Sequence, residues 1–166
     1  MYLGLLFNYN GNCCQGRKNL VDQAQKALYA LYRQKYNLAI PVDLQLKLFD
    51  TLVTPILLYS SEIWGFECIF NIEKIHLQFC KRVLSVRSST PNFMVYGELG
   101  RFPLELQTKI KMICFWNKLV SSKNKLSGKL YQLLLTLHSS GSNKFKWINY
   151  VRSILDDTGF SNIWNS

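Results

Sequence analysis

The sequence predicts a mainly α-helical protein with one short β-strand at its N-terminus. Along most of the chain, apolar residues recur every three or four positions, which is the period of an amphipathic helix. Prolines and glycines such as Pro41, Gly97 and Gly159 interrupt this periodicity and separate the helices. Residues 2–9 have the aromatic and aliphatic composition of a strand, and turn-forming residues follow at 10–12.

The predicted strand has no convincing partner in the rest of the sequence. A strand needs a neighbour for its backbone hydrogen bonds, so we expect it to be a piece of a larger sheet, with Met1 not a natural start. The remainder is expected to be a helical bundle followed by a helical extension. The boundaries predicted for the three regions are 1–12, 13–103 and 104–166, with a linker at 139–143 in the last.

The bundle region is predicted to contain four helices. Asp43 and Asn71 are suitable N-cap residues for the second and third of them, and Pro55 would kink or end the second. The predicted ranges are about 17–36, from 43 to about 55, 71–86 and a part of 92–103. The residues expected to face inward are Leu20, Val21, Ala24, Ala27, Leu28, Leu31, Leu44, Leu48, Phe49, Leu52, Val53, Ile72, Ile75, His76, Phe79, Cys80, Val83 and Leu84. The segment 58–66 is too apolar for a surface site and is expected in the core.

The extension is predicted to contain three more helices. A glycine at 159 is expected to stop the last one. The predicted ranges are 104–120, about 126–137 and 144–156. The residues expected to face inward are Leu106, Ile110, Ile113, Trp116, Val120, Trp147, Ile148, Val151, Ile154 and Leu155.

Composition excludes several classes of protein. With 48% hydrophobic and 18% charged residues, the chain is unlike a disordered tail. No apolar run approaches the roughly 18 residues of a membrane-spanning helix, and the N-terminus has neither the basic region nor the cleavage site of a signal peptide. The 5 cysteines are odd in number and irregularly spaced. We therefore expect a reduced, intracellular protein, in the nucleus or cytoplasm, without a membrane partner.

The charge balance points to a polyanionic partner. Lys and Arg total 20 and Asp and Glu total 10, which gives a net charge of +10. No acidic residue lies between Glu105 and Asp156, so this interval is purely basic. It is either a surface that releases counterions from a phosphate backbone or a solubilising face with snorkelling side chains. On the first helix, tyrosines interleave with Arg33 and Lys35, which suits either nucleic-acid contact or tyrosine-rimmed packing.

Three groups of residues are candidates for a catalytic or metal site. His76 and Cys80 are four positions apart on one helix face and could ligate zinc, but a core histidine and cysteine explain them better. The Cys13–Cys14 pair lies close to Arg17 and Lys18, a setting that could activate a thiol, yet no histidine partner is evident. The Asp156–Asp157 pair fits a solvated helix end better than a two-metal centre. No phosphate-binding glycine loop is present.

Several segments of the sequence together are similar to one known region of a protein family. They are Tyr2-Leu3-Gly4, Ala27-Leu28-Tyr29-Ala30-Leu31-Tyr32, the run from Leu46 to Tyr59, Glu62-Ile63-Trp64-Gly65, the run from Ile75 to Arg82, Thr90-Pro91-Asn92, and Tyr96-Gly97-Glu98-Leu99-Gly100. With these segments, the sequence resembles the C-terminal part of the reverse transcriptase of non-LTR (LINE-type) retrotransposons of animals. The similarity runs over nearly the whole chain and is strongest from Tyr2 to about Trp116.

The resemblance implies a position within a polymerase. In that family, Tyr-Leu-Gly lies on the last palm strand, which would account for an unpaired strand here, and the helices that follow form the thumb and a helical extension. The catalytic aspartates, which hold Mg²⁺, lie in the palm upstream, and no such motif occurs in this sequence. The resemblance therefore implies a fragment without activity or cofactor of its own, whose partners are the RNA/DNA template–primer duplex and the missing palm and fingers.

Two functions remain open at this point. As a thumb fragment, the chain would hold the duplex through sequence-independent contacts with its backbone. As an orphaned protein-interaction module, it would dock through the unpaired strand, Trp64 and Trp116. A small thiol or zinc enzyme is a weaker third interpretation. The residues expected to contact phosphates are Arg17, Lys18, Lys26, Arg33 and Lys35 on the first helix and, as a second choice, Lys109, Lys111 and Lys118.

Overall fold

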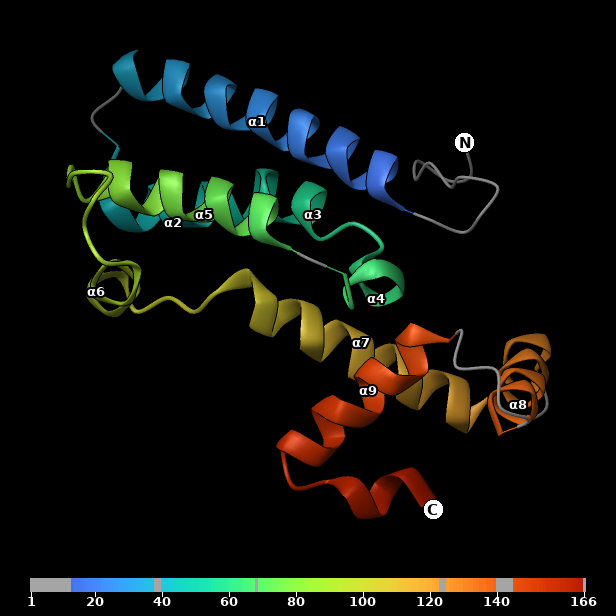
Figure 1. The fold of residues 1–166 in the computed structure, drawn as a ribbon. Coiled ribbons are helices and arrows are strands. Elements are labelled where there is room, and N and C mark those ends of the chain that lie inside the picture. The colour runs from blue at the N-terminus through green and yellow to red at the C-terminus, as the bar shows by residue number, and fades with distance from the viewer. Residues whose placement is uncertain (1–12, 38–39, 68, 123–124, 140–144, 166) are drawn as a thin grey trace. The chain divides into compact units, whose positions relative to one another are not determined.

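The computed structural model describes residues 13–37, 40–67, 69–122, 125–139 and 145–165 (Figure 1). These residues are mainly α-helical, which confirms the predicted fold class, and none of them forms a strand. The strand predicted over 2–9 lies outside the described residues. The chain divides into two compact units. The first takes in the described residues up to 60 together with 69–105, and the second takes in 61–67 and the described residues from 106 onward.

The first unit is built around a long helix and its neighbours. Its helices are α1 (Cys14–Asn37), α2 (Val42–Leu52), α3 (Thr54–Leu57), α5 (Phe70–Val83) and α6 (Asn92–Leu99). Helix α1 packs against α2, α3 and α5, and α5 also packs against α6 (Figure 1). Ala24 and Leu28 of α1 are completely buried, and the rings of Phe49 and Phe79 stack with their centres 4.2 Å apart. The apolar stripes of these helices therefore meet in one core.

Local sequence accounts for the helix ends only in part. The expected caps were wrong: Pro41 and Ile69 occupy the N-cap positions of α2 and α5, without a side-chain hydrogen bond. Asp43 lies in the first turn of α2, where its charge suits the positive end of the helix. Pro55 ends α2 as predicted, because it sits in the first turn of α3, where no backbone N–H is needed. Within residues 58–66 the structure has one further helix, α4 (Ser61–Trp64). It was not predicted, because a single turn is too short to show a helical period.

The second unit surrounds a core of Met112, Trp116, Tyr131, Val151 and Leu155. Its elements are α4 (Ser61–Trp64), the part of α7 (Leu104–Ser121) from residue 106, α8 (Leu126–Ser139), α9 (Lys146–Asp157) and a 3₁₀ helix η1 (Ser161–Asn165). The Trp116 ring N–H donates a 2.8 Å hydrogen bond to the Tyr131 hydroxyl, and its ring stacks on that of Trp164. Gly159, with a φ of +80°, ends α9 as predicted.

Several residues expected inside are exposed. Leu44 and Leu52 of α2 are 47% and 48% exposed, and Leu106 and Ile110 of α7 are 45% and 55% exposed. Helix α7 instead buries a row at every fourth position, and that row consists of Leu104, Thr108, Met112 and Trp116. The segment 58–66 is in the core only in part: Leu58, Ser61 and Trp64 are buried, whereas Tyr59 and Ile63 are both 40% exposed. The inward residues of α9 are confirmed, with Trp147 half-buried.

Candidate nucleic-acid interface

Helix α1 presents three of the predicted basic residues on one outward face. Lys18, Lys26 and Arg33 are exposed, and the helical repeat places them within about 80° of one another around the axis. Tyr29, which is 53% exposed, lies on the same face, together with one acidic residue, Asp22. From Lys18 to Arg33 the row extends about 22 Å along the helix. We call Lys18, Lys26 and Arg33 the α1 basic face.

The other two predicted contacts on α1 are not part of this face. Arg17 is half-buried on a different side of the helix, and its guanidinium donates a hydrogen bond to the sulfur of Cys14 at 3.3 Å. That side faces the core, because Leu20, Ala24 and Leu28 lie next to it around the helix axis. The side chain of Lys35 lies outside the described residues. The sequence identified the basic character of α1 but not which of its cations share a face.

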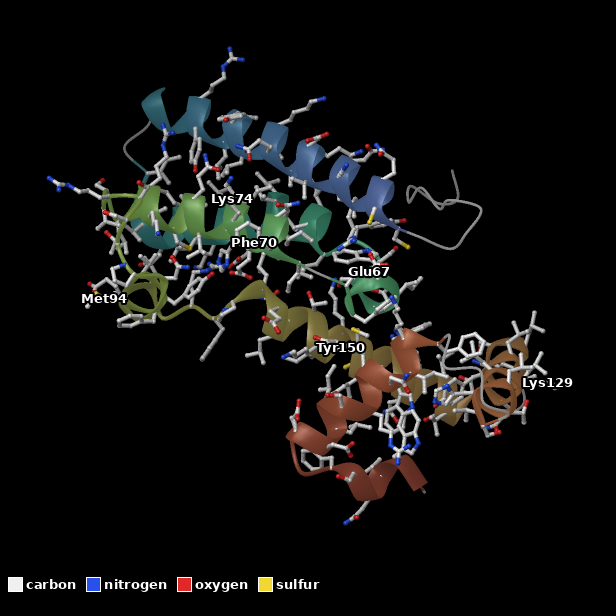
Figure 2. All side chains as sticks on the ribbon, in the orientation of Figure 1. Glu67, Phe70, Lys74, Met94, Lys129 and Tyr150 are labelled. Atoms are coloured by element: carbon white, nitrogen blue, oxygen red, sulfur yellow. The ribbon has the colours of Figure 1, made fainter. Side chains whose placement is uncertain are left out.

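A groove on α5 was missed as a site by sequence reasoning. It has a volume of about 870 Å³ and follows the outer side of α5 and the turn after it. Lys74, Lys81 and Arg82 line it together with exposed or half-exposed apolar side chains, among them Phe70, which Figure 2 labels with Lys74. The signal was present in the sequence, because every third or fourth residue on the polar side of this helix is basic or amide-bearing. We call this hollow the α5 groove.

Arg82 connects the α5 groove with α1. Its guanidinium carbon lies 3.9 Å from the centre of the Tyr32 ring, which is a cation–π contact between the two helices. Burial raises the pKa of Tyr32 to about 12, so its hydroxyl stays protonated at neutral pH. Within the groove, Lys81 donates a 2.7 Å hydrogen bond to the Ser88 carbonyl oxygen. One cation of the groove therefore rests against α1 within the first unit.

The acidic residue that lines the groove, Glu73, is engaged elsewhere. Its carboxylate accepts hydrogen bonds from the His76 ring at 3.2 Å, from the Tyr96 hydroxyl, and from the Leu104 N–H at 2.8 Å. Burial alone would raise the pKa of Glu73, but these hydrogen bonds outweigh burial and hold that pKa below its usual value. The Glu73 carboxylate is therefore satisfied by three internal donors.

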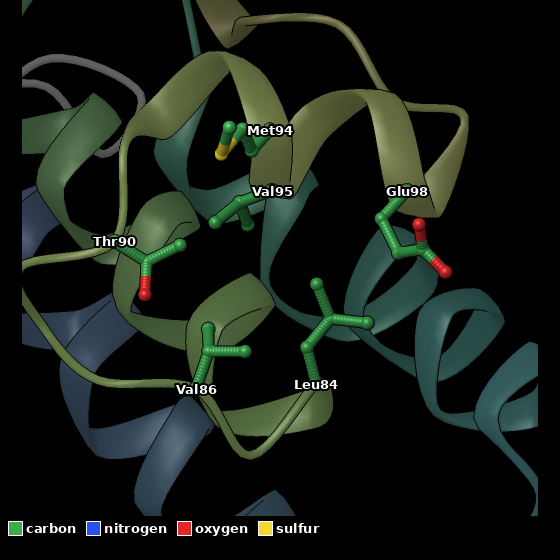
Figure 3. A pocket seen from close by; sticks show the side chains of 6 residues that line it. All are labelled: Leu84, Val86, Thr90, Met94, Val95 and Glu98. Carbon is green, nitrogen blue, oxygen red and sulfur yellow. The ribbon is translucent and has the colours of Figure 1, made fainter.

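A second, smaller hollow lies where α5 ends and α6 begins. Its volume is about 370 Å³, and it shares Val86 with the α5 groove. Figure 3 shows the aliphatic side chains of Leu84, Val86 and Val95 facing its interior, with the Glu98 carboxylate at the edge. This lining suits an apolar contact and offers no arrangement for acid–base chemistry.

The second-choice lysines on α7 do not form one group. Lys111 and Lys118 are exposed and seven residues apart, so they share a face of the helix. Lys109 is half-buried and lies on the opposite side. These residues belong to the second unit, and any phosphate contact made by α7 would involve Lys111 and Lys118.

The two candidate zinc ligands of the sequence, His76 and Cys80, are both completely buried in the structure. Both ring nitrogens of His76 are engaged, one with Glu73 and the other with Arg101, so neither is available to a metal. Burial raises the pKa of the Cys80 thiol to about 12. Among the described residues no three His, Cys, Asp or Glu side chains gather in a metal-binding arrangement. Asp156 and Asp157 are exposed at the end of α9, as expected of a solvated helix end.

The docking surface predicted for a protein-interaction module was wrong at both tryptophans. Trp64 is completely buried, and Trp116 is 5% exposed. Trp116 belongs to the core of the second unit. The strand that would complete that surface lies outside the described residues.

Comparisons with protein-family models, with curated proteins and with solved structures find no match to this chain. None of the helices in the described ranges is both long enough and apolar enough to cross a bilayer. The strongest candidate site in the described part of the chain is therefore the basic surface formed by the α1 basic face and the α5 groove.

Proposed function

We propose that this chain is the thumb and connection part of a non-LTR retrotransposon reverse transcriptase and holds the template–primer duplex through sequence-independent backbone contacts. The observation that carries the proposal is the α1 basic face, in the same unit as the α5 groove, whose Arg82 contacts Tyr32 of α1. The sequence motifs described above supply the link to the polymerase family. The chain would contribute binding, while the chemistry would belong to the palm aspartates of the intact enzyme.

The dimensions of the α1 basic face suit a nucleic-acid backbone. A row about 22 Å long can meet several successive phosphates, since these are a few ångströms apart along each strand. Lys and Arg contacts to phosphate fix the position of a duplex without reading its sequence. Tyr29 adds a hydroxyl and an aromatic ring that can rest against a sugar or a base. A polymerase needs this kind of contact, because it must hold every sequence that it copies.

Salt dependence tests the proposal directly. Each cation that no longer neutralises a phosphate should reduce the slope of log K against log salt by about 0.9 for a duplex. We expect the triple variant Lys18→Gln, Lys26→Gln, Arg33→Gln to lower the slope for an RNA–DNA hybrid by about 2 to 3 between about 50 and 200 mM salt. Two hybrids of unrelated sequence should bind the full chain equally well. Fluorescence anisotropy with labelled hybrids measures both quantities.

A matched variant controls for the loss of charge as such. Lys47, Lys146 and Arg152 are also exposed, and they lie on other helices. Changing all three to glutamine removes the same charge and the same residue types, so we expect the slope to stay close to that of the unmodified chain. Equal reductions in the two triple variants would show a diffuse charge effect and contradict the assigned interface. An isotherm that hardly changes with salt would contradict duplex binding altogether.

A further inference from the structure

Helix α8 exposes a continuous row of leucines. Leu126, Leu130, Leu133 and Leu137 are 74%, 55%, 56% and 48% exposed. Their spacing of four, three and four residues is that of a coiled-coil seam, and it places them within about 60° around the helix axis. We call these four residues the α8 leucine row. It extends about 17 Å, or roughly three helical turns.

The α8 leucine row is not the face through which α8 packs in its own unit. That face carries Gly128 and Tyr131, which are buried, and the Tyr131 hydroxyl accepts the hydrogen bond from Trp116 at 2.8 Å. Helix α8 is therefore held in the second unit by one side and offers the leucines on another. An exposed apolar row of this length, beside polar residues, is typical of a protein-interaction surface.

The charge beside the row indicates what could cover it. Lys125 and Lys129 are exposed and lie in the column next to the leucines, which continues with Gln132 and Thr136. Positions that flank a coiled-coil seam set partner choice through their charges. Helix α8 has no acidic residue, and none occurs anywhere between Glu105 and Asp156. A second copy of this chain would bring lysines toward a surface that is already basic, whereas acidic flanks would complement it.

We propose that the α8 leucine row binds an amphipathic helix of a partner protein, one with aliphatic residues at heptad spacing and Asp or Glu at the flanking positions. The leucines would interdigitate with the partner's apolar side chains, and Lys125 and Lys129 would select for the acidic flank. The partner helix needs about three to four turns to cover the row. This surface lies apart in sequence from the α1 basic face, so the inference does not depend on duplex binding.

The proposal can be tested with two synthetic helical peptides of three heptads. Both carry leucines at the seam positions, one with Glu and the other with Lys at the flanks. We expect the Glu peptide to bind the full chain, and the Lys peptide to bind at least tenfold more weakly. The double variant Leu130→Gln, Leu133→Gln should weaken binding of the Glu peptide at least tenfold, measured by fluorescence anisotropy.

Exposed leucines elsewhere provide the control. Leu44 and Leu52 of α2 are 47% and 48% exposed, so Leu44→Gln, Leu52→Gln removes the same side chains from another surface and should leave peptide binding unchanged. Circular dichroism verifies that the variants fold. If the glutamine double variant does not fold, the double variant Leu130→Ala, Leu133→Ala takes its place. In that alanine pair, too, we expect a clear loss of binding.

Four results would overturn the proposal. Equal binding of the Glu and Lys peptides would show that the flanking charges do not select a partner. Binding of neither peptide would show that the row does not hold an amphipathic helix. If the chain dimerises and Leu130→Gln, Leu133→Gln abolishes the dimer, the occupant of the row is a second copy of the chain. Row-dependent binding to vesicles of anionic phospholipid, without binding of the Glu peptide, would identify a lipid surface instead.

Discussion

Arg101 donates a hydrogen bond from its Nε–H to Nε2 of His76, 3.1 Å away. Because arginine can only donate, Nε2 is the acceptor, and the proton of the neutral ring is on Nδ1, where it is donated to Glu73. Arg101 also pairs with Asp50 of α2. His76 is completely buried on α5, so this arginine joins the end of α6, the core of α5 and the surface of α2.

Replacing Arg101 with alanine should lower the free energy of unfolding by about 2 kcal/mol, since a buried acceptor on His76 loses its donor and Asp50 loses its partner. The free energy of unfolding of Arg101→Lys should lie between those of the unmodified chain and Arg101→Ala, because a single ammonium cannot reproduce the forked contacts of the guanidinium. Urea denaturation measures these changes. The exposed Arg87 is the control, and Arg87→Ala should stay within about 0.5 kcal/mol of the unmodified chain. A similarly small effect of Arg101→Ala would show that this contact contributes little.

Acid should destabilise the first unit through Glu73. The pKa of Glu73 is lower in the folded chain than its usual value of about 4.5, so the folded state binds fewer protons than the unfolded state in that range. The stabilisation is complete above pH 4.5 and is lost as the pH falls through the folded pKa. Denaturant unfolding between pH 7 and pH 3 should show a weaker acid dependence in Glu73→Gln.

The carboxyl of Glu98, exposed on α6, provides the comparison for that measurement. Glu98→Gln should keep the acid dependence of the unmodified chain. If Glu73→Gln and the unmodified chain lose stability equally between pH 5 and pH 3, other carboxyl groups are responsible.

Gly65 should not tolerate a side chain. A Cβ at this position would lie 2.2 Å from Cγ2 of Thr108 and 2.5 Å from the Ser61 carbonyl oxygen. Gly65→Ala should therefore lower the free energy of unfolding by about 2 to 3 kcal/mol. At Gly97, on α6, a Cβ would meet no atom within 4 Å. Gly97→Ala should stabilise the chain by up to about 1 kcal/mol, because alanine favours helix. Thermal unfolding of both variants tests the contrast, and equal effects would contradict it.

The Cys80 thiol should be inert in the folded protein. It is completely buried, and burial raises its pKa to about 12, so little thiolate forms at neutral pH. Cys114 is exposed on α7 and should react quickly with an alkylating reagent. Peptide mapping after timed labelling at pH 8 should find Cys80 modified only once denaturant is added. Labelling of Cys80 as fast as that of Cys114 would indicate that this part of the core opens readily.

The helices were largely predictable because their apolar residues recur with the helical period. Helix α9 shows this well, since its predicted inward residues match those that are buried. Helix ends were less predictable: Asp43 and Asn71 are good capping residues by type, but the N-caps of α2 and α5 each lie two residues earlier. The single turn of α4 was missed because one turn is too short to show a period.

The basic residues of the candidate site were largely predictable from the sequence, but the α5 groove was not. The sequence identified Lys18, Lys26 and Arg33, and local helical geometry places them on one face. It also grouped Arg17 with them, although Arg17 bonds to Cys14 on another side of the helix. The α5 groove required the structure, because a hollow depends on the neighbouring turn and on the path of the chain into α6.

By itself, the sequence determined the helical class, the basic charge and most of the apolar helix faces, since these follow from residue type and local period. Only the tertiary structure decided which apolar faces are covered: Leu28 is completely buried, whereas Leu126 is 74% exposed. It also decided that His76 meets Arg101, which is 25 residues away in the chain. The sequence pattern shows that a helix face is apolar or that a side chain can form hydrogen bonds. Whether that face is buried, and which group the side chain bonds to, depends on segments distant in sequence.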